Sequence, residues 1–186
     1  MKHRPSVYQP RALLLLAGCV LPCYTCRVSN TQNAQGGARV RIPPPLIFLG
    51  FIVLGVWLHH RRPLVVAIPP IVRHVAAGLV GAAGAALVAT SFNWFRRTGQ
   101  NAAPWKPSPT LILQGPYKFS RNPMYLGMAL VVLAPGVWMS DLWLAIFAAA
   151  SLIVVRFTAV LPEETYLTER FGESYTQYLA KVRRWL

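Results

Sequence analysis

The chain has 186 residues, of which 54% are hydrophobic and only 13% are charged. The charged share is about half of that in an ordinary soluble domain, which excludes a disordered chain and argues against a soluble globule. Lys and Arg number 19 against 5 Asp and Glu, for a net charge of +14. The basic residues lie between apolar runs rather than in one patch. This distribution is typical of a membrane protein with basic loops, not of a nucleic-acid-binding protein.

Residues 1–41 differ in composition from the rest of the chain. Their short apolar run, residues 12–21, cannot cross a bilayer, which takes about 20 apolar residues, and a polar stretch rich in Asn, Gln and Gly follows it. We interpret these residues as an N-terminal extension, mobile or signal-like. Cys19, Cys23 and Cys26 have a spacing that also holds iron–sulfur clusters, but no alternating strand–helix pattern follows, so we predict no metal site.

Residues 42–186 form the predicted membrane domain. Its candidate spans are the apolar runs at 42–58, 75–95, 124–139 and 142–161. Ser140 and Asp141 separate the last two runs, which predicts a tight turn and a helical hairpin. In the second run a small residue recurs every four positions, at Ala77, Gly81, Ala85 and Ala89. Such a ridge predicts close contact with another helix.

After Pro162 the pattern becomes amphipathic. Apolar and aromatic residues recur in steps of three or four from Leu167 to Val182, which marks one face of a single helix. Glu163 and Glu164 fall in its first turn and basic residues in its last, as the helix dipole favours. This helix is too polar to span, so it should lie at the membrane surface or fold back over the preceding loop. The predicted fold is therefore all-α: a polytopic membrane bundle of about four spans with an amphipathic cytosolic C-terminal helix.

The loop at 96–122 carries five basic residues, which predicts that it lies in the cytoplasm. The C-terminal helix then lies on the same side. We expect an integral protein of the cytoplasmic (inner) membrane whose active site faces the cytosol. The basic residues Arg61, Arg62 and Arg73 fall outside in this arrangement and argue against it.

One group of candidate residues surrounds the start of the third run. Asn122 is a good N-cap and Pro123 fits the first helical turn. The unpaired N–H groups of that turn, together with Arg121, make a candidate anion site. Tyr117 and Tyr125 supply flat rings able to pack on an adenine or a sulfonium. The alternative interpretation is a capped helix with an interfacial belt of Arg and Tyr.

A second group is Arg156 with the two glutamates. A charge inside an apolar run is a candidate for function. Seven residues on a helix turn through about 700°, so Arg156 and Glu163 would share a face, although Pro162 interrupts the helix. The alternatives are that Arg156 snorkels to the interface and that Glu163 and Glu164 form a plain solvated first turn.

Two sequence blocks carry a resemblance. Residues 115–127 read Gly-Pro-Tyr-Lys-x-x-Arg-Asn-Pro-Met-Tyr-x-Gly, and residues 163–184 read Glu-Glu-x-x-Leu-x-x-x-Phe-Gly-x-x-Tyr-x-x-Tyr-x-x-x-Val-Arg-Arg. With a helical hairpin between them, they closely resemble the isoprenylcysteine carboxyl methyltransferase family, which belongs with the membrane phospholipid methyltransferases. The resemblance covers about residues 42–186.

The resemblance implies an integral membrane enzyme that uses S-adenosylmethionine (SAM) in a cytosol-facing pocket. By motif position, the residues implied to bind SAM are Tyr117, Arg121, Asn122, Pro123, Tyr125 and Leu126 on one side, and Glu163 and Glu164 on the other. Some members have His at the position of Asn122, and because Asn is no base near neutral pH we expect it to bind rather than transfer protons. The family uses an arginine upstream of the glutamate pair to hold the acceptor, and the resemblance implies this role for Arg156, at a longer spacing than the family pattern. The candidate catalytic residues are Arg156 and, as bases, Glu163 and Glu164.

We therefore predict SAM-dependent methyl transfer to a lipidic or prenyl-like acceptor. A carboxylate acceptor would need alignment and a cation such as Arg156, whereas an amine would need a base such as Glu163 or Glu164. The alternatives are a membrane sterol or enone reductase that uses NADPH, and a catalytically silent membrane partner. The expected partners are a small lipidic acceptor and membrane lipid, not nucleic acid. The oligomeric state stays open.

Overall fold

The computed structural model describes residues 37–186 except 39, 102 and 105. Most of the N-terminal extension, including Cys19, Cys23 and Cys26, lies outside the described residues. Within the described part, the elements are α1 (Pro44–Arg61), α2 (Pro70–Arg97), η1 (Gly115–Lys118), α3 (Pro123–Met139), α4 (Leu142–Val155), η2 (Arg156–Val160), α5 (Leu161–Phe171) and α6 (Glu173–Lys181). η1 is a 3-10 helix and η2 a π-helix. These residues contain no β-strand, only an isolated bridge between Val65 and Asp141, so the all-α prediction is confirmed.

Three helical stretches are long and apolar enough to cross a membrane: α1, α2 and the continuous helix Leu142–Phe171. α3 is an apolar helix of 17 residues, about 25 Å long at 1.5 Å per residue. The prediction of a membrane bundle with about four apolar helices is confirmed. α2 begins at Pro70, five residues before the predicted start, because Pro70 fits the first turn of a helix without losing a hydrogen bond.

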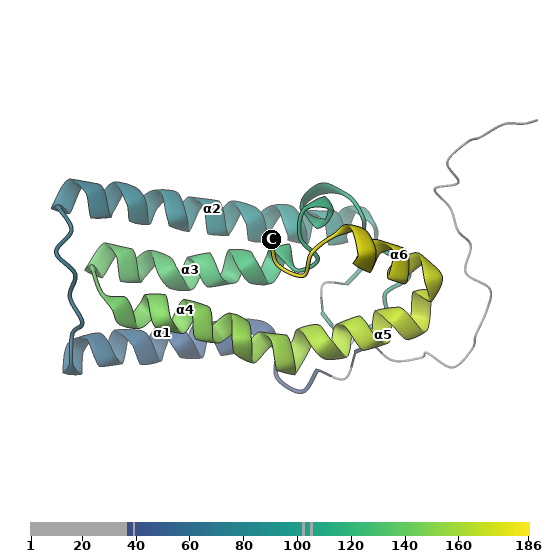
Figure 1. Cartoon of the computed structure of the whole chain (residues 1–186), viewed down its shortest axis with the longest axis horizontal. Coiled ribbons are helices and arrows are strands. Elements are labelled where there is room, and N and C mark those ends of the chain that lie inside the picture. Colours follow the sequence, from purple (N-terminus) through teal and green to yellow (C-terminus); the bar gives the residue numbers. More distant parts are fainter. Residues whose placement is uncertain (1–36, 39, 102, 105) are drawn as a thin grey trace, which may run out of the picture. The chain divides into compact units, whose positions relative to one another are not determined.

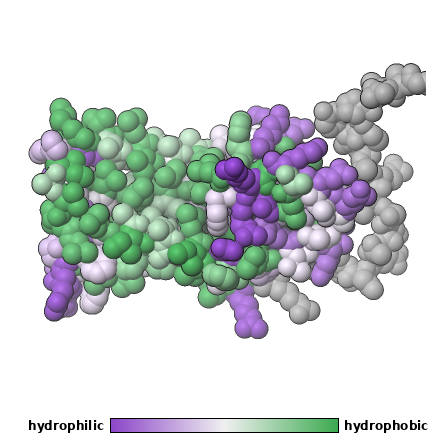
Figure 2. Space-filling model, viewed as in Figure 1, coloured by the Kyte–Doolittle hydropathy of each residue, from purple (hydrophilic) through white to green (hydrophobic). Residues whose placement is uncertain are grey.

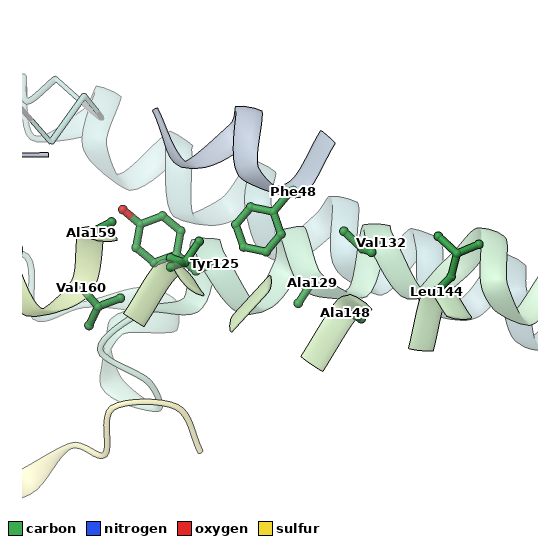
Figure 3. Close-up of a cluster of buried hydrophobic side chains, with 9 residues drawn as sticks. Phe48, Tyr125, Ala129, Val132, Leu144, Ala148, Ala159 and Val160 are labelled. Carbon is green, nitrogen blue, oxygen red and sulfur yellow. The ribbon is translucent and has the colours of Figure 1, made fainter. Parts of the chain in front are cut away.

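The helices pack side by side, with α3 between α2 and α4 and with α1 mainly against α4 (Figure 1). The core between α1, α3, α4 and η2 is apolar throughout (Figure 3). Its buried residues are Phe48, Tyr125, Ala129, Val132, Leu144, Ala148, Val155, Ala159 and Val160. Tyr125 lies at one end of this core, beside Ala159 and Val160.

α2 and α3 approach each other closely at two glycines. A Cβ at Gly84 would lie 2.8 Å from the backbone oxygen of Gly127, and a Cβ at Gly127 would lie 2.8 Å from the oxygen of Gly84. The predicted ridge is only partly correct, because Ala77 is buried but Ala85 and Ala89 are exposed. Steps of four residues drift by about 40° around a helix. The buried positions of α2 are instead seven apart: Ala77, Gly84 and Ser91.

The predicted hairpin turn between α3 and α4 is confirmed. Ser140 adopts a left-handed conformation (φ 55°), and the Asp141 carboxylate caps α4 by accepting from the Trp143 backbone N–H at 2.7 Å. The same carboxylate, whose side chain is 0% exposed, lies 2.8 Å from His59 Nδ1 and accepts from the Leu64 N–H at 3.0 Å. Asp141 therefore fastens the end of α1 and the following connection to the hairpin.

The C-terminal region differs from the single predicted helix. α5 continues α4 through η2, so Glu163 and Glu164 do not lie at a free helix N-terminus and the dipole interpretation is wrong. Gly172, at φ 54° and ψ −125°, ends α5 and turns the chain into α6. This conformation is strongly unfavourable for a residue with a Cβ, so the turn requires a glycine. Because the helix ends at this glycine, the amphipathic pattern is divided between α5 and α6. Arg183 and Arg184 follow the end of α6 at Lys181.

The surface of the bundle is largely apolar. Ile71, Leu79 and Val53 are 76%, 67% and 61% exposed. Figure 2 shows a hydrophobic band over the transmembrane helices, while hydrophilic side chains gather around α5 and α6. A continuous exposed apolar surface of this kind is stable in lipid rather than in water, so this is an integral membrane protein.

Candidate active site

A cavity, partly open to solvent, lies where α2 ends and α3 begins. Its walls come from the end of α2, the loop before η1, the start of α3, and the helices α5 and α6. The lining residues are Ala38, Phe95, Gln100, Asn101, Ala103, Pro104, Ser108, Thr110, Leu111, Ile112, Tyr117, Arg121, Asn122, Met124, Tyr125, Glu163, Glu164, Tyr166, Leu167, Tyr175 and Tyr178. A mostly apolar cavity lined with a few polar groups is a candidate small-molecule site.

The carboxylate of Glu164 is held by two arginines. Its Oε1 accepts from Arg121 Nη1 at 3.0 Å and from Arg184 Nε at 2.9 Å, and its Oε2 accepts from Arg184 Nη2 at 2.7 Å. The side chain of Glu164 is 14% exposed. These contacts exclude the interpretation of Glu164 as part of a plain solvated turn, because its charge is neutralised by partners that lie far from it in the sequence.

Glu163 has different surroundings. Its Oε1 accepts a hydrogen bond of 2.6 Å from the hydroxyl of Tyr125, which is itself 8% exposed and packed in the core (Figure 3). No ion pair to Glu163 is found among the described residues. Of the two adjacent carboxylates that line the cavity, one is therefore paired with cations and the other with a neutral donor.

Asn122 and Pro123 occupy the predicted positions at the start of α3, as N-cap and first helical residue. The Asn122 side chain does not cap the helix, however, and the prediction of a capping role is wrong. Its Nδ2 donates to the backbone oxygen of Arg184 at 3.1 Å, while its backbone N–H donates to Ser120 Oγ at 3.1 Å. The first turn of α3 therefore has no side-chain cap, and its positive end lies beside the cavity through Met124 and Tyr125.

Tyrosines close the cavity on the side of α6. The hydroxyl of Tyr178 donates to the backbone oxygen of Tyr117 at 2.7 Å, which confirms that the C-terminal region folds back over the loop. Burial raises the pKa of Tyr178 to about 12, although the charge of Arg121 opposes this shift. Burial also raises the pKa of Tyr117 well above its ordinary value of 10. Both phenols therefore stay protonated near neutral pH and do not act as bases.

Arg156 does not join the predicted site. Its side chain is exposed, its guanidinium lies 5.6 Å from the Phe157 ring centroid, and it does not line the cavity. The expectation that Arg156 and Glu163 share a face assumed a regular α-helix. Residues 156–160 instead form a π-helix, whose wider turns rotate the chain less per residue. This π-turn also accommodates Pro162, which has no N–H to donate.

Six of the nine predicted site residues line the cavity: Tyr117, Arg121, Asn122, Tyr125, Glu163 and Glu164. Pro123 is buried and Leu126 half-buried within α3, and neither lines the cavity. For Arg184, which ends the second sequence block, the sequence predicted only a place in the last turn of the C-terminal helix and no role in the site. Gln100 was not predicted either. Its Nε2 donates to the Thr110 hydroxyl and to the Thr110 backbone oxygen, both at 2.6 Å, and these contacts close the intervening loop.

Fold and cavity together define an integral membrane protein with a small-molecule site at one end of its helical bundle. The sequence model of the family described as phospholipid methyltransferase matches residues 72–174, more than half of the chain. A protein of Haemophilus influenzae, described as an uncharacterized protein, is 38% identical over 65 residues, which are 34% of this chain and 100% of that protein. The chain belongs to the phospholipid methyltransferase family, and the resemblance stated from the two sequence blocks is confirmed at this level. The matched segment contains every predicted site residue.

Proposed function

We propose that the protein catalyses SAM-dependent methyl transfer to a lipidic acceptor at the membrane. The observation that carries the proposal is the cavity, in which two adjacent carboxylates with different partners face an arginine and several tyrosines. Its position at the end of an apolar bundle suits an enzyme that takes one ligand from water and one from lipid. Membership of a methyltransferase family supports the same class of reaction.

The cavity residues fit SAM, which carries a carboxylate, an amine, ribose hydroxyls, an adenine and a sulfonium. Arg121 Nε is buried and has no hydrogen-bond partner among the described residues, so it suits a carboxylate ligand. Glu163 and Glu164 suit amine and hydroxyl groups, and the tyrosine rings suit the adenine or the sulfonium. When bound, SAM supplies an electrophilic methyl group. The protein must orient the acceptor and exclude water from the cavity.

We propose an amine rather than a carboxylate as the acceptor. A carboxylate needs a cation to hold it, but Arg156 lies outside the cavity and Arg121 is paired with Glu164. An ammonium group must lose a proton before its nitrogen can attack, and Glu163, which has no ion-pair partner among the described residues, can accept this proton. A prenyl-like carboxylate, which the isoprenylcysteine methyltransferase resemblance implies, would have to be held by Arg121 itself.

Transfer of labelled methyl groups tests the proposal. Membranes containing the wild-type protein, Glu163→Gln or Glu169→Gln are incubated with methyl-labelled SAM, and the lipids are extracted. Glu169 is an exposed carboxylate of α5 outside the cavity and serves as the matched control. We expect alkali-stable label in a nitrogen-containing lipid with the wild type and Glu169→Gln, and its loss with Glu163→Gln. Label released by alkali as methanol would identify a carboxylate acceptor, and equal labelling by all three proteins would contradict the proposed site.

A further inference from the structure

The last residues of the chain form an ordered segment beside the cavity. Residues 182–186, here called the C-terminal strap, leave α6 at Val182, whose backbone is extended, and run back to the start of α3 (Figure 1). The Arg121 backbone N–H donates to the Arg183 oxygen at 3.0 Å. The Arg184 oxygen accepts from Asn122 Nδ2 at 3.1 Å and from Ser120 Oγ at 3.3 Å. Trp185 packs against the hydrophobic core.

Arg184 connects this strap to the other wall of the site. Its guanidinium forms a two-pronged contact with both oxygens of Glu164, at 2.9 and 2.7 Å, and its side chain is 28% exposed. Bidentate contacts of this kind fix the plane of a carboxylate as well as its charge. In the described part of the chain, Arg121 makes only a single hydrogen bond to the same carboxylate, at 3.0 Å.

Arg184 thus links two walls of the cavity, although it does not itself line the cavity. The backbone of Arg184 is held by the loop before α3, and its side chain holds α5. We infer that Arg184 is a positioning residue of the SAM site, which orients Glu164. Arg121 then needs to give Glu164 only the hydrogen bond from Nη1, and its Nε, which has no partner among the described residues, can face the ligand. This inference rests on the proposed function of the cavity.

Arg183 provides a matched control. It is the neighbouring arginine, its side chain is exposed, and it contributes only its backbone oxygen to the contacts found among the described residues. Replacing it by Gln removes the same charge and leaves that oxygen in place. SAM affinity is therefore compared by calorimetry in detergent for the wild type, Arg183→Gln, Arg184→Gln, Arg184→Lys, Glu164→Gln and the double variant Glu164→Gln/Arg184→Gln.

We expect Arg184→Gln to weaken SAM binding at least about tenfold, the size of a lost charge-assisted contact. Arg183→Gln should bind like the wild type and Arg184→Lys should restore part of the loss, since Lys keeps the charge but not the fork. If Arg184 acts through Glu164, the double variant should bind no more weakly than Glu164→Gln. Wild-type affinity in Arg184→Gln, or fully additive losses in the double variant, would overturn the inference.

A measurement without ligand separates this inference from the proposed function. Hydrogen exchange at the Arg121 amide, which the strap covers, is compared between Arg184→Gln and Arg183→Gln. Faster exchange in Arg184→Gln alone supports the positioning role, and equal exchange in both overturns it. If the wild type binds no SAM, the proposed function fails, but the exchange rates still decide whether Arg184 orders this wall of the cavity.

Discussion

Glu163 and Glu164 are neighbours in the sequence, yet their partners give them different tasks. Glu164 joins Arg121 to Arg184, so its charge contributes to the structure of the cavity as well as to any ligand contact. Glu163 meets only the Tyr125 hydroxyl among the hydrogen-bond donors found, and it remains available to accept a proton. A residue pair that reads as one motif in the sequence therefore divides into a carboxylate held by two arginines and one held by a tyrosine hydroxyl, for which we propose the reactive role.

Replacing each glutamate by Gln should separate these tasks. We expect Glu163→Gln to lower the methyl-transfer rate by about 100-fold or more, the usual contribution of a general base, with little change in melting temperature because Gln can still accept from Tyr125. Glu164→Gln should instead lower both SAM affinity, about ten- to hundredfold, and the melting temperature. Rates, titrations and melting curves in detergent measure these effects, with Glu169→Gln as the control. Near-normal rate and affinity in both variants would remove the carboxylates from the site.

Asp141 acts at the opposite end of the molecule. Burial alone would raise the pKa of its carboxyl group, but the hydrogen bonds with His59 and with the backbone N–H groups of Trp143 and Leu64 outweigh it and hold the pKa below its usual range. A lowered pKa in the folded state stabilises the fold above the pKa of the unfolded chain, about 3.9. This stabilisation is lost as the pH falls through the folded-state pKa.

We therefore expect Asp141→Asn to lower the melting temperature at pH 7, corresponding to about 1.5–3 kcal/mol for the lost charged hydrogen bonds. Asn still caps α4 well, so the variant isolates the effect of the charge. The difference from the wild type should stay constant above about pH 5 and shrink below about pH 4. A difference that does not depend on pH would show that the charge of Asp141 contributes nothing.

At the level of the helices, the sequence predicted the apolar elements well because their signals are local. The hairpin turn at Ser140 and Asp141 and the start of α3 at Pro123 follow from turn and first-turn preferences. The π-helix and the break at Gly172 were not predicted, because the spacing of apolar residues continues across both. The position of Arg156 depends on that π-helix, and for this reason sequence spacing could not predict that Arg156 lies outside the cavity lining.

The close contact of α2 and α3 at Gly84 predicts that a larger side chain there destabilises the fold. Leu at Gly84 would meet the backbone of Gly127 and the Leu130 side chain, and overpacking of this kind costs about 1–3 kcal/mol. Leu at Gly78, an exposed glycine of the same helix with no atom within 4 Å of a Cβ, is the matched control and should cost little. Melting curves in detergent compare the two. Equal stability of both variants would contradict the close helix contact.

For the whole molecule, the described part of the chain is polarised along the bundle. The described residues of the loop 98–114, α5 and α6 lie at the end that holds the cavity, and the connection after α1 and the hairpin turn lie at the other (Figure 1). The sequence predicted this division into two ends from the order of the spans. It did not predict the strap, because contacts between the chain's end and residues 120–122 depend on the folded arrangement and leave no periodic signal.

Labelling of single cysteines tests which end faces the cytosol, in a background without Cys19, Cys23 and Cys26. We expect Lys106→Cys and Ser174→Cys, at the cavity end, to react with an impermeant reagent only after the cells are permeabilised. His60→Cys, at the opposite end, should react in intact cells. All three residues are exposed in the structure. The reverse pattern would place the cavity outside the cytosol and contradict the proposed access of SAM.

Titration of the purified protein in detergent with SAM and with NADPH tests directly whether the cavity is a SAM site. The cavity presents two carboxylates and one arginine, which is paired with one of the carboxylates. These charged groups suit the zwitterionic SAM and repel the multiply phosphorylated NADPH. We expect binding of SAM in the micromolar range, weakened at least about tenfold in Glu164→Gln, and no measurable heat with NADPH. Binding of NADPH without binding of SAM would contradict it and favour the membrane reductase.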